Sequence, residues 1–123
     1  MKKIIVVDDE PDVIYSIKEG LGTDFEITGV DSGKQLFQKL ETFIPDLVLL
    51  DIMMPEMNGW QVLKKLKESE KLKNIPVIII SARKDKTAKN AGCFYAEDYI
   101  EKPFTINDIK ETITKTLKSK IST

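Results

Sequence analysis

The chain has 123 residues, 41% of them hydrophobic and 32% charged, with 19 Lys and Arg against 20 Asp and Glu. This length fits one domain with a sizeable core, and a net charge of −1 gives no general reason to expect nucleic acid or an anionic membrane as partner. Histidine is absent and Cys93 is the single cysteine, which excludes Ser-His-Asp catalysis, histidine-based zinc sites and an internal disulfide.

Short β-branched runs alternate along the chain with amphipathic stretches. The pattern predicts, in chain order, strand 3–7, helix 12–21, strand 26–30, helix 34–43, strand 46–50, helix 60–70, strand 76–80, helix 84–91, strand 98–101 and helix 106–118. The central strands are apolar on both faces, as parallel strands covered by helices are. We therefore predict an α/β fold with a five-stranded parallel sheet and helices on both faces. The fifth strand is the least apolar, so we expect it at an edge.

The apolar runs are too short for export or membrane insertion. The first, 4–7, has four residues, and the later run 75–80 is interrupted by Pro76. A secretory signal needs about 7–15 apolar residues and a membrane span about 20. We therefore expect a soluble, cytoplasmic protein without a membrane partner, in keeping with its single cysteine.

Chemically useful side chains follow four of the five predicted strands. They are Asp8, Asp9 and Glu10 after the first, Asp51 after the third, Ser81 after the fourth, and Lys102 with Pro103 after the fifth. In open parallel sheets functional groups gather at the carboxyl ends of the strands. We therefore expect these carboxylates, the hydroxyl and the lysine to meet at one edge of the sheet.

Each of these residues also has a purely structural interpretation. The acidic turn before Pro11 is a common way to begin a helix. Asp51 could open a turn, Ser81 could cap a helix, and Lys102 could be a solvated surface lysine.

The joint pattern favours a phosphoryl-accepting site. Two unit charges about 4 Å apart interact by roughly 4 kcal/mol at an effective dielectric of about 20, so clustered aspartates would repel one another without a cation. Mg²⁺ favours one or two carboxylates together with waters and a phosphate. An aspartate can act as a nucleophile toward phosphorus, while a metal and a lysine neutralise the phosphoryl oxygens. The pattern therefore predicts phosphoryl acceptance by Asp51.

Five motifs carry a resemblance to a known family. They are Val6–Glu10, Leu49–Pro55, Met57–Gly59, Ser81–Arg83 and Lys102–Phe104. In this order and at this spacing they resemble the receiver domain of two-component response regulators, over about residues 3–118. The resemblance implies the flavodoxin-like, doubly wound (βα)5 fold, and one receiver domain over 1–123 without an output module, as in the single-domain, CheY-like members.

The resemblance also implies a Mg²⁺-dependent phosphorylation site. Asp51 matches the phospho-acceptor. Asp9 and Asp51 match direct Mg²⁺ ligands, the backbone carbonyl of Met53 matches a third ligand, and Asp8 matches an acid that contacts the metal through water.

Further positions match the phosphate contacts and the switch. Ser81 and Lys102 match the hydroxyl and the lysine that contact the phosphoryl group. Tyr99 matches an aromatic that turns inward as Ser81 moves, although it is also a plausible core-edge tyrosine. The Lys102–Pro103 peptide would be cis, a conformation realistic only before proline. Met53 and Arg83 match positions that set the lifetime of the phosphoryl group.

One stretch departs from the family pattern. The predicted helix 84–91 is short and Gly92 comes early, which puts the shape of the usual partner-binding face in question.

The resemblance implies a histidine kinase or phosphotransfer protein as phosphodonor, an unidentified downstream protein, and no direct nucleic-acid binding. It implies a signalling switch that catalyses at most its own phosphorylation and dephosphorylation.

Three alternatives remain open at this point. A pseudo-receiver would act only as an interaction module. An aspartate-nucleophile phosphatase would need DxDxT after the first strand, where this chain has Asp8-Asp9-Glu10-Pro11-Asp12. A flavin mononucleotide binder would need a Ser/Thr/Gly-rich phosphate loop there, where acids would repel the phosphate.

Overall fold

The computed structural model describes residues 1–52, 59–81 and 96–121. Within these ranges the elements are β1 (Lys2–Val7), α1 (Pro11–Leu21), β2 (Phe25–Val30), α2 (Gly33–Leu40), β3 (Leu47–Asp51), α3 (Gly59–Glu68), β4 (Val77–Ser81), β5 (Asp98–Glu101) and α5 (Ile106–Ile121). The predicted helix 84–91 lies outside the described residues.

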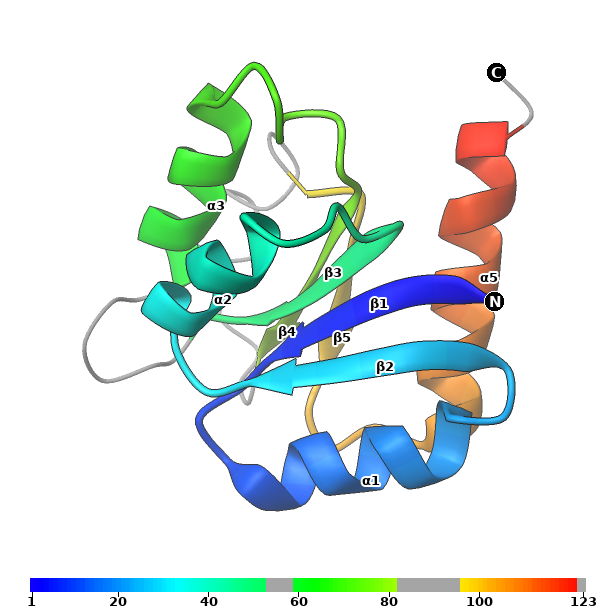
Figure 1. Cartoon of the computed structure of the whole chain (residues 1–123). Coiled ribbons are helices and arrows are strands. Elements are labelled where there is room, and N and C mark those ends of the chain that lie inside the picture. Colours follow the sequence, from blue (N-terminus) through cyan, green and yellow to red (C-terminus); the bar gives the residue numbers. More distant parts are fainter. Residues whose placement is uncertain (53–58, 82–95, 122–123) are drawn as a thin grey trace.

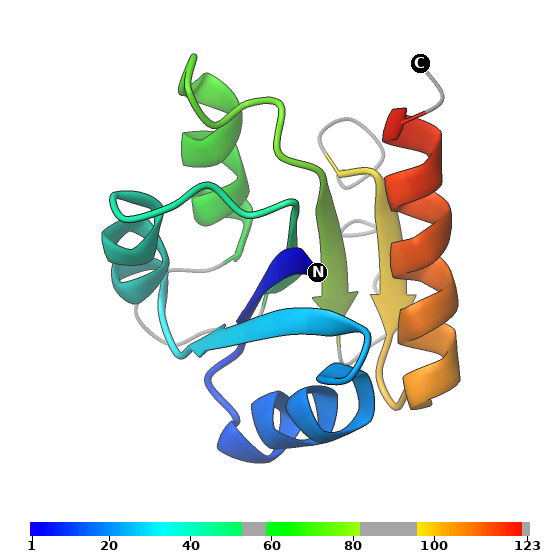
Figure 2. The ribbon, with the colours of Figure 1, turned by 45° about the vertical axis from the view of Figure 1, so that its right-hand side comes forward.

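The strands form one sheet in the order β2-β1-β3-β4-β5, and every neighbouring pair is parallel. Helices α2 and α3 cover one face, and α1 and α5 cover the other (Figures 1 and 2). This arrangement confirms the predicted α/β fold, with the strand order of flavodoxin-like folds. The short β5 lies at an edge of the sheet, as predicted.

Alternation along the central strands divides the core into two layers. The α2–α3 layer joins Ile5, Val7, Val48, Leu50, Val77 and Ile79 of the sheet to Leu36, Leu40, Val62, Leu63 and Leu66 of the helices. The α1–α5 layer joins Ile4, Val6, Leu47, Leu49, Ile78 and Ile80 to Ile17, Leu21, Ile109 and Ile113. Because successive strand residues point to opposite faces, each of these runs feeds both layers. This explains why they contain no polar residue.

Local sequence signals begin the helices. Pro11 stands in the first turn of α1, where its missing N–H is not needed. Ser32 caps α2, since its hydroxyl accepts a hydrogen bond from the Gln35 N–H at 3.1 Å. Thr105 and Asp108 form a reciprocal cap at α5, because each backbone N–H donates to the other residue's side chain at 3.2 and 3.0 Å.

Several element bounds differ from the prediction. Helix α2 ends at Leu40 and not at 43, because the Glu41 N–H donates to the Gln38 carbonyl and the Thr42 hydroxyl donates to the Lys39 carbonyl, which closes a tighter last turn. Helix α3 ends at Glu68 and not at 70, where the Ser69 N–H turns back to the Leu66 carbonyl.

Two differences concern the predicted site. Strands β3 and β4 run one residue later than predicted, because the parallel ladder pairs Asp51 with Ile80 and Ser81 with Glu101. Both side chains therefore belong to the last residue of a strand and not to the loop that follows it. This fixes their backbone within the sheet.

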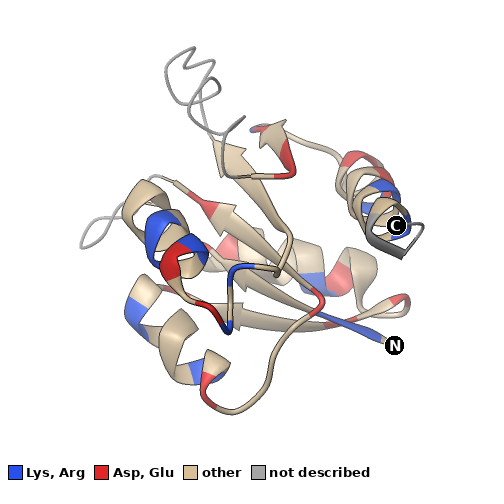
Figure 3. Ribbon diagram, turned by 90° about the horizontal axis from the view of Figure 1, so that it is seen from above, with Lys and Arg blue, Asp and Glu red and all other residues tan. Residues whose placement is uncertain are grey.

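Charged residues lie mainly on the helices and at the ends of strands, while the strand interiors are apolar (Figure 3). No helix in the described part of the chain is long and apolar enough to cross a membrane.

Candidate functional site

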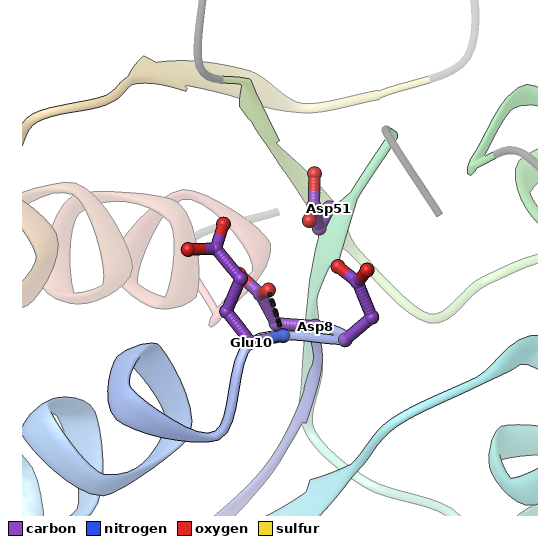
Figure 4. Close-up of side chains that lie close together, drawn as sticks. Asp8, Glu10 and Asp51 are labelled. Atoms are coloured by element: carbon purple, nitrogen blue, oxygen red, sulfur yellow. Dashed lines mark hydrogen bonds between the residues drawn. The ribbon is translucent and has the colours of Figure 1, made fainter. Parts of the chain in front are cut away.

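Four carboxylates meet where β1 and β3 end, at the carboxyl edge of the sheet. Asp8, Asp9, Glu10 and Asp51, here called the acidic cluster, each offer an oxygen within 4.8 Å of the others. Figure 4 shows Asp8 and Glu10 on the segment that leaves β1, facing Asp51 at the end of β3. Asp8 is 0% exposed and Asp51 is 2% exposed, whereas Asp9 and Glu10 are exposed. The cluster is therefore buried on one side and open on the other.

The backbone holds Asp8 in place. Its N–H donates to the Val30 carbonyl at 3.1 Å, which continues the β1–β2 ladder by one residue. Its Oδ1 accepts the Glu10 N–H at 2.9 Å (Figure 4). Asp8 therefore also organises the turn into α1, so the structural interpretation of the acidic turn is correct for this residue and compatible with a role in the cluster.

Gly59 allows α3 to begin against the end of β3. The Gly59 N–H donates to the Ile52 carbonyl at 3.0 Å. A Cβ at this position would lie 2.4 Å from the Ile52 Cα and 2.8 Å from the Asp51 carbonyl oxygen, both of which are backbone atoms. Only a glycine therefore fits without displacing the backbone that carries Asp51.

The ammonium group of Lys102 lies among the four acids, and it is the one ammonium group that the described residues place there. Its Nζ lies 2.9 Å from Asp8 Oδ2, 3.1 Å from Glu10 Oε1 and 3.6 Å from Asp51 Oδ2. Its backbone N–H donates to the Ser81 carbonyl at 2.6 Å, which ties it to the end of β4. The peptide bond between Lys102 and Pro103 is cis, which confirms the expectation from the resemblance.

Opposing effects set the protonation of Lys102. Its burial alone would lower its pKa, but the hydrogen bond and charge of Asp8, the charge of Asp51 and the hydrogen bond to Glu10 raise the pKa above the ordinary lysine value. The side chain is therefore a fixed positive charge at neutral pH. It neutralises only one of the four carboxylates.

Ser81 and Tyr99 lie on neighbouring strands and share a face of the sheet. Ser81 is 2% exposed and, by strand alternation, shares the face of Ile79. Tyr99 is half-buried, pairs in register with Ile79 and packs against the α2–α3 layer. Met53 and Arg83 lie outside the described residues.

The residues fit a hard divalent cation. Carboxylate oxygens are the ligands that Mg²⁺ prefers, and the acidic cluster keeps an excess of negative charge after Lys102 is counted. A surface pocket of about 340 Å³ adjoins the cluster and includes Asp8 and Asp9 in its lining. Water and ligands can therefore reach the exposed Asp9 from solvent, whereas Asp8 is 0% exposed.

The sequence pattern places Glu10 in the acidic turn after the first strand but predicts no individual role for it. The structure places its carboxylate against Lys102, although 92 positions separate the two residues. Local patterns carry no signal for such a contact. The parallel topology predicts that Glu10 and Lys102 lie at the same edge of the sheet, but it does not identify them as a pair.

The sequence pattern of the family described as "Response regulator receiver domain" matches residues 4–114. The chain belongs to the response regulator receiver family. It is 36% identical to the transcriptional regulatory protein CiaR of Streptococcus pneumoniae, over 96% of this chain and 52% of CiaR. It is also 36% identical to the two-component response regulator ORR5 of Oryza sativa subsp. japonica, over 94% of this chain and 88% of ORR5.

A solved structure agrees with this receiver assignment. The receiver domain of the Francisella response regulator 1452 is 29% identical, with a TM-score of 0.88 over 98% of this chain and 99% of that one. Five curated relatives, CiaR among them, are longer proteins of which this chain spans between 9% and 52%. Receiver domains thus occur within larger regulators and kinases, and this chain is a receiver domain of two-component systems.

Proposed function

We propose that this receiver domain accepts a phosphoryl group on Asp51 in a Mg²⁺-dependent reaction. The donor would be a histidine kinase, a phosphotransfer protein or a small phosphodonor. An Asp51 carboxylate oxygen attacks phosphorus, a new O–P bond forms, and the bond from phosphorus to the donor atom breaks. One observation carries the proposal: the buried Asp51 carboxylate lies 3.6 Å from the Lys102 ammonium and within 4.8 Å of three further carboxylates.

The neighbouring residues have complementary roles in this proposal. Asp9, Asp51 and the Met53 backbone carbonyl would hold Mg²⁺ directly, with Asp8 acting through water. Bound Mg²⁺ supplies positive charge that offsets the charge of the phosphoryl oxygens.

Lys102 and Ser81 would contact the transferred group. The Lys102 ammonium already lies 3.6 Å from Asp51 Oδ2 and would donate to a phosphoryl oxygen there. The Ser81 hydroxyl donates to a second oxygen.

Phosphorylation would change the packing of the protein surface around Tyr99. Ser81 and Tyr99 share a face on adjacent strands, so a shift of Ser81 toward the phosphoryl group alters the packing around Tyr99. Phosphorylation must stabilise one of the two arrangements more than the other, because equal stabilisation would switch nothing. Moving the population from 1:99 to 99:1 needs about 5.5 kcal/mol of differential free energy. The domain would thus act in the cytoplasm as a switch for a downstream protein, without turnover of other substrates.

The test is incubation with acetyl phosphate, with and without Mg²⁺, followed by intact-mass measurement. We expect one labile phosphoryl adduct that needs Mg²⁺ and is absent in Asp51→Asn. Asp31→Asn is the matched control, since Asp31 is an exposed aspartate directly after β2 at the same edge of the sheet. The proposal is wrong if no adduct forms, or if Asp51→Asn still carries it. A chain that takes no phosphoryl group but binds a partner protein would instead be the interaction module.

A further inference from the structure

Glu10 makes a contact that the proposed chemistry does not use. It occupies the N-cap position of α1, yet its side chain makes no capping hydrogen bond. The carboxylate points to Lys102 instead, with Glu10 Oε1 at 3.1 Å from Nζ. The Glu10 carboxylate thus bonds a lysine that follows β5, and not the backbone N–H groups at the start of its own helix.

The partners of Lys102 differ in how firmly they are held. Asp8 is fully buried and fixed by the Glu10 N–H, so it cannot turn away from the ammonium group without losing that bond. The Glu10 side chain is 61% exposed, and water can replace the ammonium group as its partner. Of the two acids that hydrogen-bond Lys102 in the described part of the chain, Glu10 is therefore the one that can release it.

Asp51 is the third acid near this ammonium group, and its distance differs from the other two. Lys102 Nζ lies 3.6 Å from Asp51 Oδ2, which is beyond a good hydrogen bond, while it lies within hydrogen-bond distance of Asp8 and Glu10. An ammonium group has three donors, and Asp8 and Glu10 accept from two of them, so a phosphoryl group that accepts more than one bond from Nζ takes the donor that Glu10 uses. A phosphoryl group on Asp51 would bring more negative charge and further acceptor oxygens to the same ammonium group.

We infer that Glu10 is a positioning residue that competes with a phosphoryl group on Asp51 for the Lys102 ammonium. In the unphosphorylated domain, Glu10 holds Lys102 on the side of the cluster that leads into α1. On phosphorylation, Lys102 leaves Glu10 for the phosphoryl oxygens. The Glu10–Lys102 pair thus stabilises the unphosphorylated state selectively, and this inference rests on the proposed function.

The first measurement uses BeF₃⁻, a phosphoryl analogue that binds aspartate reversibly. Glu10→Gln keeps the size of the side chain and removes its charge. We expect it to bind BeF₃⁻ about two- to fivefold more tightly than the wild type, the range set by an exposed ion pair. All proteins are compared at saturating Mg²⁺, so that a change in metal affinity does not enter the ratio.

The matched control is Asp12→Asn. Asp12 is an exposed acid in the first turn of α1, outside the carboxylates that the structure pairs with Lys102 in its described residues. It removes the same charge from the same helix end, so we expect an affinity equal to that of the wild type. Combining Glu10→Gln with Lys102→Met should abolish the gain, because the competition needs the ammonium group.

A second measurement reports on the contact itself. The side-chain NMR signals of Lys102, Cε and Nζ, are recorded in the unphosphorylated, Mg²⁺-free protein. We expect them to move in Glu10→Gln and to stay in place in Asp12→Asn. A residue that only supports the fold would not produce this pair of results.

The outcomes separate the inference from the proposed function. If the wild type binds no BeF₃⁻ and accepts no phosphoryl group, the proposed function fails and the inference fails with it. If the wild type does both, but Glu10→Gln matches Asp12→Asn in BeF₃⁻ affinity or in the Lys102 signals, the inference alone is wrong. A gain that persists with Lys102→Met also overturns it.

Discussion

Replacement of Asp9 by asparagine should stabilise the metal-free domain and remove its response to Mg²⁺. Asp9 belongs to four carboxylates that lie within 4.8 Å of one another, and Lys102 is the one compensating charge that pairs with them among residues 1–52, 59–81 and 96–121. The metal-free cluster therefore keeps unrelieved repulsion. Asp9 is exposed and has no structural hydrogen bond to lose in the described contacts, so its charge can be removed at little cost to the fold.

The size of the effect follows from these distances. Two like charges at 4.8 Å repel by roughly 3 kcal/mol at an effective dielectric of about 20, and by about 1 kcal/mol in water. Since Asp9 is solvated and Lys102 offsets part of the repulsion, we expect Asp9→Asn to raise the free energy of unfolding by about 1–2 kcal/mol in EDTA.

Mg²⁺ should reverse the order of stability. A ligand at a hundredfold excess over its Kd stabilises the folded state by about 2.7 kcal/mol. The wild type should gain this much, whereas Asp9→Asn, which lacks a proposed ligand, should gain little. The variant is thus the more stable protein without Mg²⁺ and the less stable one with it.

Urea unfolding followed by circular dichroism, in EDTA and in excess Mg²⁺, measures both effects. Asp31→Asn controls for net charge, because it removes an aspartate from the same edge of the sheet but outside the acidic cluster. We expect it to behave as the wild type under both conditions. The reasoning is refuted if Asp9→Asn destabilises the metal-free domain, or if it keeps the full Mg²⁺ response.

Three further predictions address the support of the site. Gly59→Ala should cost about 1–3 kcal/mol of stability and slow phosphorylation, because its Cβ would press on the backbone of Asp51 and Ile52. Gly20→Ala, whose Cβ would press on the Ile106 side chain, should also cost stability but leave phosphorylation of the folded protein unchanged in the same mass assay. The pKa of Lys102 is raised in the folded state, so its contribution to stability is complete below the ordinary lysine pKa of about 10.4 and is lost as the pH rises through the higher folded value. In EDTA, the free energy of unfolding of the wild type should therefore fall more steeply above about pH 10 than that of Lys102→Met. Lys67→Met should cost about 1–2 kcal/mol in urea unfolding with normal phosphorylation, because the Lys67 ammonium donates to the Lys73 and Ile75 carbonyls at the opposite end of the sheet; a phosphorylation defect would contradict this separation.

Apolar periodicity predicted the architecture. The runs 4–7, 47–50 and 77–80 required burial on both faces, and the structure divides exactly these residues between two core layers. The edge position of β5 followed from its weaker pattern, and the parallel five-stranded sheet followed from the alternation of strands and helices.

The same pattern predicted that Asp8, Asp9, Asp51 and Lys102 lie at one edge of the sheet, which the structure confirms. Contacts between distant side chains could not be predicted in this way. The sequence does not state that Lys102 lies closer to Asp8 than to Asp51, because that depends on the path of the chain after β5.

Helix ends were also inaccurate, since hydrogen bonds of single side chains decide them. The Thr42 hydroxyl bond that closes α2 is one example. The metal ligation, the phosphoryl contacts and the switch remain predictions, which the experiments above address.

The division of the core into two layers has a consequence for how the domain can change over evolution. By strand alternation Asp51 shares the face of Leu49 in the α1–α5 layer, whereas Ser81 and Tyr99 share the face of Ile79 on the other side. In the proposed switch, a structural change that begins at Asp51 therefore reaches Tyr99 through the carboxyl ends of the strands, where the Lys102 N–H donates to the Ser81 carbonyl. It does not pass through either apolar layer. Conservative substitutions in the core would then change the stability of the domain without changing the proposed switch. The residues at the carboxyl ends of the strands would be under separate selection.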